Sequence, residues 1–322
     1  MNKLNPDQWS SYWQDTGNIN SFSKDNYDKD IAAFWQQELS DKSYIKVIDL
    51  ACGNGAISWI ANDIINKDKN TASITGVDFS NITPFERLKI SKDDFPMIDF
   101  LGNTRLEKLP FESNTFDIAI SQYGIEYSKL KQSIPEIMRV LQPTSKLCLI
   151  IHSENSEIIQ KTAKNLKQYE ILLKEIRLHD DFIALDAIIG QETDTVKIRA
   201  TQAFIMQGKV IESKMLIVNQ IIKTVENPDV LMRYKKQLVT PFLDQSIQKR
   251  LPRKEPALLA RKTLDDYIKR INDLQNVALS DTEIDDLISL IKDHGFIIKR
   301  NEILRHDTME NAGHIIVAER NS

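Results

Sequence analysis

The sequence predicts an α/β fold in which helices cover both faces of a mostly parallel sheet. Three observations carry this prediction. Strand and helix patterns alternate between residues 44 and 152, the strand cores are continuously apolar, and a glycine turn directly follows the first strand. Small ligands bind such sheets at the carboxyl ends of the strands, so the glycine turn marks a predicted ligand site.

The alternating region contains five predicted strands separated by helices or short connections. The strands are Ile45–Leu50, Ser73–Asp78, Ile98–Leu101, Phe116–Ser121 and Lys146–His152. The helices are Ile57–Asn66, Pro84–Lys92 and Lys131–Val140. The run Gln142-Pro143-Thr144 predicts a turn before the fifth strand. Together these elements define a predicted core over residues 44–153.

The region before the core, residues 1–43, predicts a helical segment rich in aromatic residues. Trp9, Tyr12 and Trp13 are spaced so that they share one helical face. This face either packs on the core or forms a lid over a ligand pocket.

Two further regions follow the core. Residues 154–279 carry apolar residues at helical spacing and predict a mainly helical insertion, far longer than a usual connection. Residues 280–322 begin with a capping box at Ser280 and predict a final helix, Ile284–Asp293. Two strands, Phe296–Leu304 and His314–Glu319, then form a hairpin closed by a polar loop.

Composition and charge exclude several classes of protein. The 322 residues carry a net charge of -4, which gives no electrostatic footprint for nucleic acid. No apolar stretch approaches the ~20 residues that span a bilayer, and the start lacks the apolar core of a signal peptide. Cys52 and Cys148 lie in apolar segments as reduced thiols, and the histidines show no metal-ligand spacing. We expect a cytoplasmic protein without a metal site.

The glycine turn differs from a dinucleotide-binding turn. That fingerprint needs a third glycine three residues after the second, but Gly53-Asn54-Gly55 continues with Ala56-Ile57-Ser58. Asp49, at the end of the strand, would repel a pyrophosphate and suits a ligand with an ammonium group, such as S-adenosylmethionine. Asp78, at the end of the second strand, is placed to accept the hydroxyls of a ribose.

These ordered motifs resemble those of class I S-adenosylmethionine-dependent methyltransferases, as a methyltransferase-11-like domain with a long helical insertion. Asp49–Gly55 resembles the first motif and Gly76–Ser80 the second, while Arg139–Pro143 matches the end of the helix before strand five. The resemblance covers about residues 44–152 and 283–320. It implies a Rossmann-like seven-stranded sheet with an antiparallel final strand, and S-adenosyl-L-methionine as cofactor.

The resemblance also implies which residues bind the cofactor. They are Asp49, Ala51, Cys52, Gly53, Asn54, Gly55, Asp78, Phe79, Arg105, Leu106, Glu107, Ser121, Gln122 and Tyr123. Two positions depart from the family pattern. Ala51 replaces the first glycine of the turn, although alanine still permits a close turn, and Arg105 stands where an acid often meets the adenine amino group.

Three residues are candidates for the catalytic side of the site. His152 follows the fifth strand, and its reference pKa near ~6.5 suits a general base. The alternative is a histidine that caps the strand or bonds Ser153. Glu126 and Tyr127 follow the fourth strand on the side expected to face the acceptor.

We therefore expect methyl transfer to a small or medium-sized acceptor bound between the core and the helical insertion. One alternative is a methyltransferase that acts on RNA or protein through the helical block. Another is a non-catalytic fold relative that binds a nucleoside-bearing ligand. The missing Asn/Asp-Pro-Pro-aromatic signature argues against a nucleobase acceptor, and the sequence leaves the methylated atom and the oligomeric state open.

Overall fold

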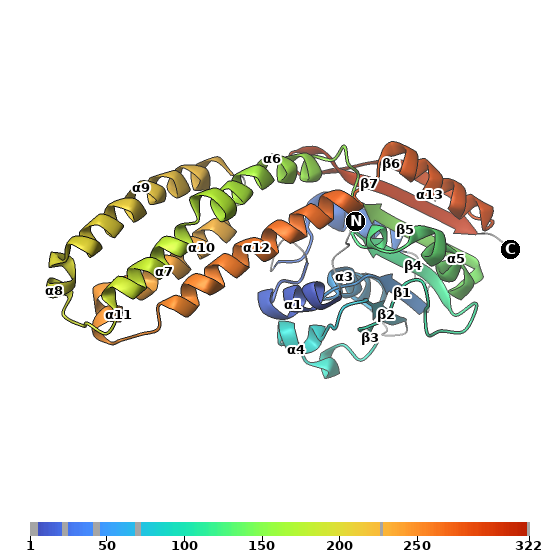
Figure 1. Cartoon of the computed structure of the whole chain (residues 1–322). Helices are drawn as coiled ribbons and strands as arrows, with labels where there is room; N and C mark the ends of the chain where they lie inside the picture. The colour runs from blue at the N-terminus through green and yellow to red at the C-terminus, as the bar shows by residue number, and fades with distance from the viewer. Residues whose placement is uncertain (1–5, 21–24, 41–45, 68–71, 226–227, 321–322) are drawn as a thin grey trace. The chain divides into compact units, whose positions relative to one another are not determined.

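The structure, a computed structural model, describes residues 6–20, 25–40, 46–67, 72–225 and 228–320. It divides into two compact units (Figure 1). We call residues 1–160 with 275–322 the core unit, and residues 161–274 the helical unit. Ile45, predicted to begin the first strand, lies outside the described residues.

The core unit is built on one seven-stranded sheet with the order β3-β2-β1-β4-β5-β7-β6. The strands are β1 (Lys46–Leu50), β2 (Ser73–Val77), β3 (Ile98–Leu101), β4 (Phe116–Gln122), β5 (Leu141–Ile151), β6 (Ile297–His306) and β7 (Met309–Arg320). The first five strands are parallel, and β7 runs antiparallel to both β5 and β6. This confirms the predicted Rossmann-like sheet with its antiparallel final hairpin.

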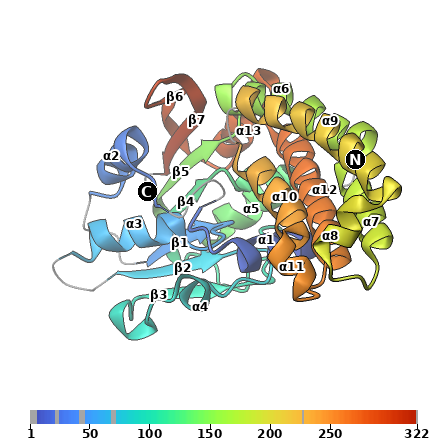
Figure 2. The same cartoon turned by 90° about the vertical axis from the view of Figure 1, so that its left-hand side faces the viewer.

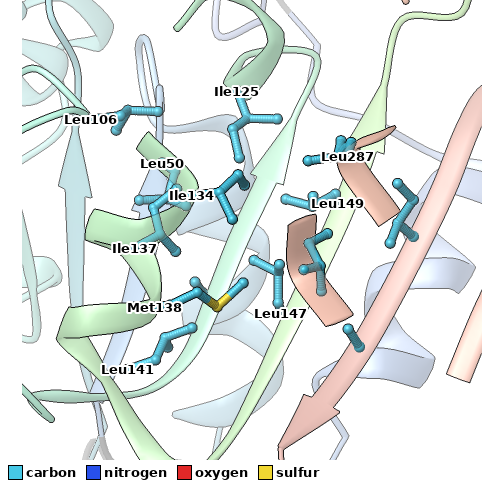
Figure 3. Packing of buried hydrophobic residues seen from close by; sticks show 14 of the residues in the cluster. Leu50, Leu106, Ile125, Ile134, Ile137, Met138, Leu141, Leu147, Leu149 and Leu287 are labelled. Atoms are coloured by element: carbon cyan, nitrogen blue, oxygen red, sulfur yellow. The ribbon is translucent and has the colours of Figure 1, made fainter. Parts of the chain in front are cut away.

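Helices cover both faces of this sheet. Alternate residues of β5 point to opposite faces: Leu147 and Leu149 join one apolar cluster, and Cys148 and Ile150 join the other. Two helices, α5 (Leu130–Val140) and α13 (Asp281–Asp293), pack on the first face, as Figure 3 shows for part of that cluster. The second face is covered by α2 (Lys29–Glu38) and α3 (Ala56–Ile65). The continuously apolar strands follow from this double burial.

Four further helical elements belong to the core unit. They are α1 (Pro6–Thr16), α4 (Pro84–Leu88) and two 3-10 turns, Lys92–Asp94 and Ile125–Tyr127. The predicted capping box is present at the start of α13, where the Ser280 side chain accepts from Glu283 N and the Glu283 side chain accepts from Ser280 N.

Two local predictions are wrong. Gln142-Pro143-Thr144 is not a turn, because β5 begins at Leu141, paired with Phe116 of β4 across a bulge. The Arg320 guanidinium of β7 satisfies the carbonyl oxygens of this stretch, including Leu141 (2.8 Å) and Gln142 (2.6 Å). The final hairpin closes through a two-residue turn at Asp307 and Thr308 instead of a longer polar loop, and Asp307 takes the left-handed conformation (φ 54°) that such turns need.

The helical unit has its own apolar core, contributed by residues such as Tyr169, Phe182, Val218 and Tyr234. Its helices are α6 (Glu157–Ile171), α7 (Leu178–Ile189), α8 (Thr195–Ala200), α9 (Gln202–Thr224), α10 (Asp229–Val239), α11 (Asp244–Gln248) and α12 (Lys254–Val277), where α6 and α12 begin or end in the core unit. Figure 2 shows them from a second side. Among the described residues, no helix is both long and apolar enough to cross a membrane.

Candidate cofactor and acceptor site

The turn after β1 is built from residues in the left-handed conformation. Ala51, Gly53 and Gly55 have φ values of 56°, 53° and 81°, and Gly55 directly precedes α3. Glycine adopts this conformation freely, whereas alanine pays roughly 1 kcal/mol or more for it. The turn is closed by Cys52 N donating to Val77 O (3.0 Å) and Gly55 N donating to Cys52 O (2.8 Å). Ala51 therefore keeps the close turn, but in a strained conformation.

The two predicted aspartates hold this turn from different sides. Asp49 is buried and accepts a hydrogen bond from Ser58 Oγ of α3 (2.7 Å), and burial raises the pKa of its carboxyl to about 7. Asp78 accepts from Gly53 N and from Ser80 N, each at 2.9 Å, and from Ser80 Oγ. Burial also raises the pKa of Asp78. Because a carboxylate has about four acceptor positions and three are used, Asp78 retains one for a ligand hydroxyl.

A cavity of about 330 Å³ lies at the carboxyl ends of β1 to β4 within the core unit. This volume falls in the range of small-molecule sites. It is lined by Trp9, Trp13, Ala51, Asp78, Phe79, Arg105, Leu106, Glu107, Tyr123, Gly124, Tyr127, Ser128 and Lys129. The lining thus comes from the four loops that follow β1, β2, β3 and β4, together with α1.

The aromatic face of α1 packs over the glycine turn. The Trp13 indole lies against Gly53 so closely that a Cβ at Gly53 would collide with it. Asn54 Nδ2 fixes this arrangement by donating to Trp13 O (3.2 Å) and Asn18 O (2.7 Å). Trp9 contacts Trp13 in a stacked arrangement at 5.9 Å and Tyr127 edge-on at 5.3 Å. The N-terminal aromatics therefore form one wall of the cavity.

The loop after β3 contributes a polar wall. Arg105 is exposed, Leu106 is buried, and Glu107 accepts a hydrogen bond from the backbone N of Lys129 (3.0 Å) through Oε1. That bond ties the loop after β3 to the start of α5. Phe79, which follows Asp78, adds a half-buried ring to the same cavity.

The end of β4 is held by contacts from distant parts of the chain. Ser121 Oγ donates to Leu50 O (2.8 Å), and Gln122 Oε1 accepts from Trp35 Nε1 (2.6 Å). Tyr123 has a φ of 53°, and its hydroxyl donates to Ala312 O (2.8 Å). Its ring lines the cavity on one side and stacks on His152, with ring centroids 4.3 Å apart.

Glu126 and His152 form a buried pair behind this wall, each about 2% exposed. Glu126 Oε1 accepts from His152 N (2.9 Å). Within the described part of the chain, Glu126 Oε2 and His152 Nδ1 have no hydrogen-bond partner. Burial raises the pKa of Glu126 to about 7 and lowers that of His152 to about 3. The imidazole is therefore neutral at pH 7, and the carboxyl is the group of the pair that titrates there.

The structure brings some of the predicted residues to the cavity wall and leaves others behind it. Those that line it are Ala51, Asp78, Phe79, Arg105, Leu106, Glu107, Tyr123 and Tyr127. The predicted residues outside the lining are Asp49, Cys52, Gly53, Asn54, Gly55, Ser121, Gln122, Glu126 and His152. Sequence reasoning did not assign Gly124, Ser128 and Lys129 to the lining, although each directly neighbours a predicted residue or its turn. No group of three potential metal ligands occurs among the described residues.

Fold and site together define a class I S-adenosylmethionine-dependent methyltransferase domain. The chain belongs to the ubiE/COQ5 methyltransferase family, whose model matches residues 10–178. S-adenosylmethionine is the cofactor of this class, and the residues present fit it, since the buried Asp78 carboxylate on the cavity wall keeps one acceptor position for a ligand hydroxyl.

Two curated proteins and a solved structure are similar to part of this chain. The chain is 32% identical over 115 residues to a 2-phytyl-1,4-naphtoquinone methyltransferase of Trichormus variabilis, covering 34% of this chain and 48% of that protein. It is 30% identical over 116 residues to the sterol 4-C-methyltransferase strm-1 of Caenorhabditis elegans, covering 34% and 31%. The chain thus spans half or less of the length of these two relatives. A solved S-adenosylmethionine-dependent methyltransferase from Aquifex aeolicus is 14% identical, with a TM-score of 0.35 over 48% of this chain and 77% of that one.

Proposed function

We propose that this protein transfers a methyl group from S-adenosylmethionine to a small or medium-sized acceptor. The observation that carries the proposal is the cavity at the carboxyl ends of β1 to β4, where the Asp78 loop, the glycine turn and the end of β4 meet. Ligands of open α/β sheets bind at this edge. Membership of the methyltransferase family supports the reaction, and the cavity is the proposed binding site for its reactants.

The cofactor end of the cavity is formed by the Asp78 loop, the turn at Ala51 and the loop of Arg105 to Glu107. Asp78 would accept a ribose hydroxyl, while Leu106 and Phe79 give apolar contacts to a base. When bound, S-adenosylmethionine supplies a methyl group activated by a positively charged sulfur. Trp9 and Trp13 would exclude water from that end, because the Trp13 indole packs on Gly53 and the Trp9 indole stacks on Trp13.

The acceptor we infer is an apolar, ring-bearing molecule. Besides the three aromatic residues of the cofactor end, two tyrosines from the loop after β4, Tyr123 and Tyr127, line the cavity. Flat apolar molecules pack well on such rings. The names of two relatives, a naphthoquinone and a sterol methyltransferase, point to acceptors of this kind. We also propose that the helical unit, inserted between β5 and β6, contributes to the choice of acceptor.

Glu126, Tyr127 and His152 remain our proposed catalytic residues, and their environments rank them. Both Glu126 and His152 lie behind the cavity wall, so we propose that either would act through the groups that line it. A general base works best with a pKa near the working pH, which favours Glu126 at about 7 over His152 at about 3. We expect Glu126→Gln to lower kcat by on the order of 100-fold with the affinity for S-adenosylmethionine preserved. A matched His152→Asn variant should lose less. Equal kcat in Glu126→Gln and wild type would remove Glu126 from the list.

Isothermal titration with S-adenosylmethionine tests the cofactor site. We expect Asp78→Ala to weaken binding by about tenfold or more, because a charge-assisted hydrogen bond contributes roughly 1.5–3 kcal/mol. Asp63→Ala is the matched control, since Asp63 is an exposed acid of α3 outside the cavity lining. Binding that is absent in the wild type, or unchanged in Asp78→Ala, would contradict the site.

Transfer of a labelled methyl group tests the acceptor. The probes are reduced 2-phytyl-1,4-naphthoquinone, a sterol and total RNA, each incubated with the protein and methyl-labelled S-adenosylmethionine. We expect label in a lipid-soluble product. Label in RNA would overturn the inferred acceptor class but leave the methyltransferase intact, whereas cofactor binding without label in any metabolite extract would favour a non-catalytic relative.

A further inference from the structure

The helical unit exposes more large apolar side chains than the core unit. They gather most densely on α9, where Met206 and Leu216 are 60% and 67% exposed, and Ile205, Val210 and Ile217 are also exposed. Soluble proteins rarely keep such a set together on one surface unless something covers it. We call the exposed side of α9, from Ile205 to Ile217, the α9 face. The helix itself is labelled in Figure 2.

The opposite side of the same helix is already used. Ile211, Met215, Val218 and Ile222 pack into the core of the helical unit, with Val218 fully buried. At 100° per residue, these positions lie on the side of α9 facing away from Met206 and Ser213. The α9 face is therefore a second apolar surface that the fold of the unit does not need.

Two rows of residues run along the α9 face, and both have a symmetric spacing. One row is Ile205, Lys209, Glu212 and Leu216, and the other is Met206, Val210, Ser213 and Ile217. Each row has steps of four, three and four residues. Reversing the helix about the midpoint between residues 210 and 211 superposes the first row on itself, and the second row does so about a point one residue farther on, which is about 1.5 Å along the helix axis. Large apolar residues stand at both ends of each row. This is the pattern of a surface that can pair with its own copy around a two-fold axis.

The charges in the first row follow the same symmetry. Reversal places Lys209 at the level of Glu212, and Ile205 at the level of Leu216. Antiparallel pairing would thus set Lys209 against Glu212 of the partner subunit, twice in each dimer. In the second row Ser213 is small and lies at the middle, where a small residue allows two helices to approach.

We propose that the α9 face is a self-association surface, on which α9 pairs antiparallel with α9 of a second copy of this chain. A bilayer is the other possible occupant of an exposed apolar helix face. Glu212, at the centre of the face and exposed, argues against it, because an anionic membrane repels a carboxylate. A second copy instead provides Lys209 of the partner subunit as its counter-ion.

Light scattering coupled to size-exclusion chromatography tests this proposal on the full chain. We expect the mass to rise from one chain toward two as the loading concentration increases. The double variant Met206→Glu with Leu216→Glu should stay at one chain, and circular dichroism would verify that it remains folded. Leu259→Glu is the control, because Leu259 is 52% exposed on α12, outside the α9 face.

A charge exchange distinguishes the antiparallel pairing from other contacts. Lys209→Glu creates two like-charge pairs per dimer, and Glu212→Lys does the same, so each should weaken dimerisation by on the order of tenfold. Combining the two exchanges should restore it. A wild type that stays at one chain, or a dimer unaffected by Met206→Glu with Leu216→Glu, would overturn the proposal. So would a dimer lost in Leu259→Glu alone.

Discussion

The two ends of the cavity are assembled from contacts of very different reach. At the cofactor end, Asp49 binds Ser58 nine residues away, and Asp78 binds Ser80 two residues away. At the end of β4, which we propose as the acceptor end, Gln122 is held by Trp35, 87 residues away, and the Tyr123 hydroxyl by Ala312, 189 residues away. The proposed cofactor end thus combines bonds within short motifs with bonds of medium reach, such as that of Gly53 to Asp78 25 residues away, whereas the end of β4 is held from much farther along the chain.

The two ends of the cavity also differ in how many hydrogen bonds their buried carboxyl groups accept. Asp78 has donors on both of its oxygens, from Gly53 and Ser80. Glu126 has a donor on one oxygen only among the described residues, and the other oxygen is buried without a partner. A buried unpaired oxygen is costly, so it is expected where a function needs it. The comparison teaches that the two carboxyl groups are held differently: Asp78 accepts three hydrogen bonds, whereas Glu126 keeps one oxygen without a partner among the described residues.

The largest effect expected at the cofactor end is that of Gly53→Ala. The new Cβ would both take a φ of 53° and collide with Trp13, at a combined cost of roughly 3 kcal/mol of the free energy of unfolding. Gly17→Ala is the matched control, because Gly17 has a φ of 60° with open space around it and bears the backbone cost alone. Urea titration measures both. Equal losses in the two variants would mean that Trp13 does not pack on the turn.

At the acceptor end, we expect stability to depend on the charge of Glu126. Burial raises its pKa from an ordinary 4.5 to about 7, so the folded state holds the proton over that range while the unfolded state releases it. Glu126 therefore contributes stability below pH 4.5 that is lost as the pH rises to 7, by up to roughly 3 kcal/mol.

Glu126→Gln removes this loss. The free energy of unfolding of the variant, relative to wild type, should rise between pH 4.5 and 7 and then stay constant. His152 gives the opposite slope, because its pKa is lowered to about 3 and its stability contribution is lost as the pH falls below 6.5. His152→Asn thus serves as the internal comparison. A pH-independent difference for Glu126→Gln would show that Glu126 reaches solvent.

The sequence predicted the fold because the fold follows from local patterns, whereas the cofactor-binding roles of single residues stay predictions. Continuous apolar strands, the turn after β1 and the acids at two strand ends are readable within a few residues each. The wrong turn at Gln142 and Pro143 has a different cause. Residue types favoured a turn there, but pairing of Leu141 with Phe116 and the guanidinium of Arg320 stabilise a strand. Arg320 is too far along the chain for a local pattern to include it.

The acceptor end was harder to predict for the same reason. His152 was chosen for its ordinary pKa and its place after β5, and neither reveals that Tyr123 stacks on it and that burial lowers the pKa of its imidazole. The catalytic roles of Glu126, Tyr127 and His152 therefore stay predictions. The sequence did not predict Gly124 as a lining residue. Gly124 leaves room for the methyl group of Ala51, and this contact forms only when β1 and β4 lie side by side.

The smallest effect expected concerns this contact between the two ends. Ala51 is left-handed, and its methyl group would lie 2.7 Å from a Cβ at Gly124. Ala51→Gly should relieve about 1–2 kcal/mol of backbone strain and lose about 0.5–1 kcal/mol to unfolded-state entropy, a net gain near 0.5 kcal/mol. Gly124→Ala alone should be destabilising by roughly 1–3 kcal/mol, and less so when combined with Ala51→Gly. Thermal and urea unfolding of the four proteins measure this coupling. If the changes in the free energy of unfolding are additive, Ala51 and Gly124 do not touch, and the two ends of the cavity are independent. A smaller loss in the double variant than the sum of the two would show that Gly124, after β4, compensates for the missing glycine at Ala51, after β1.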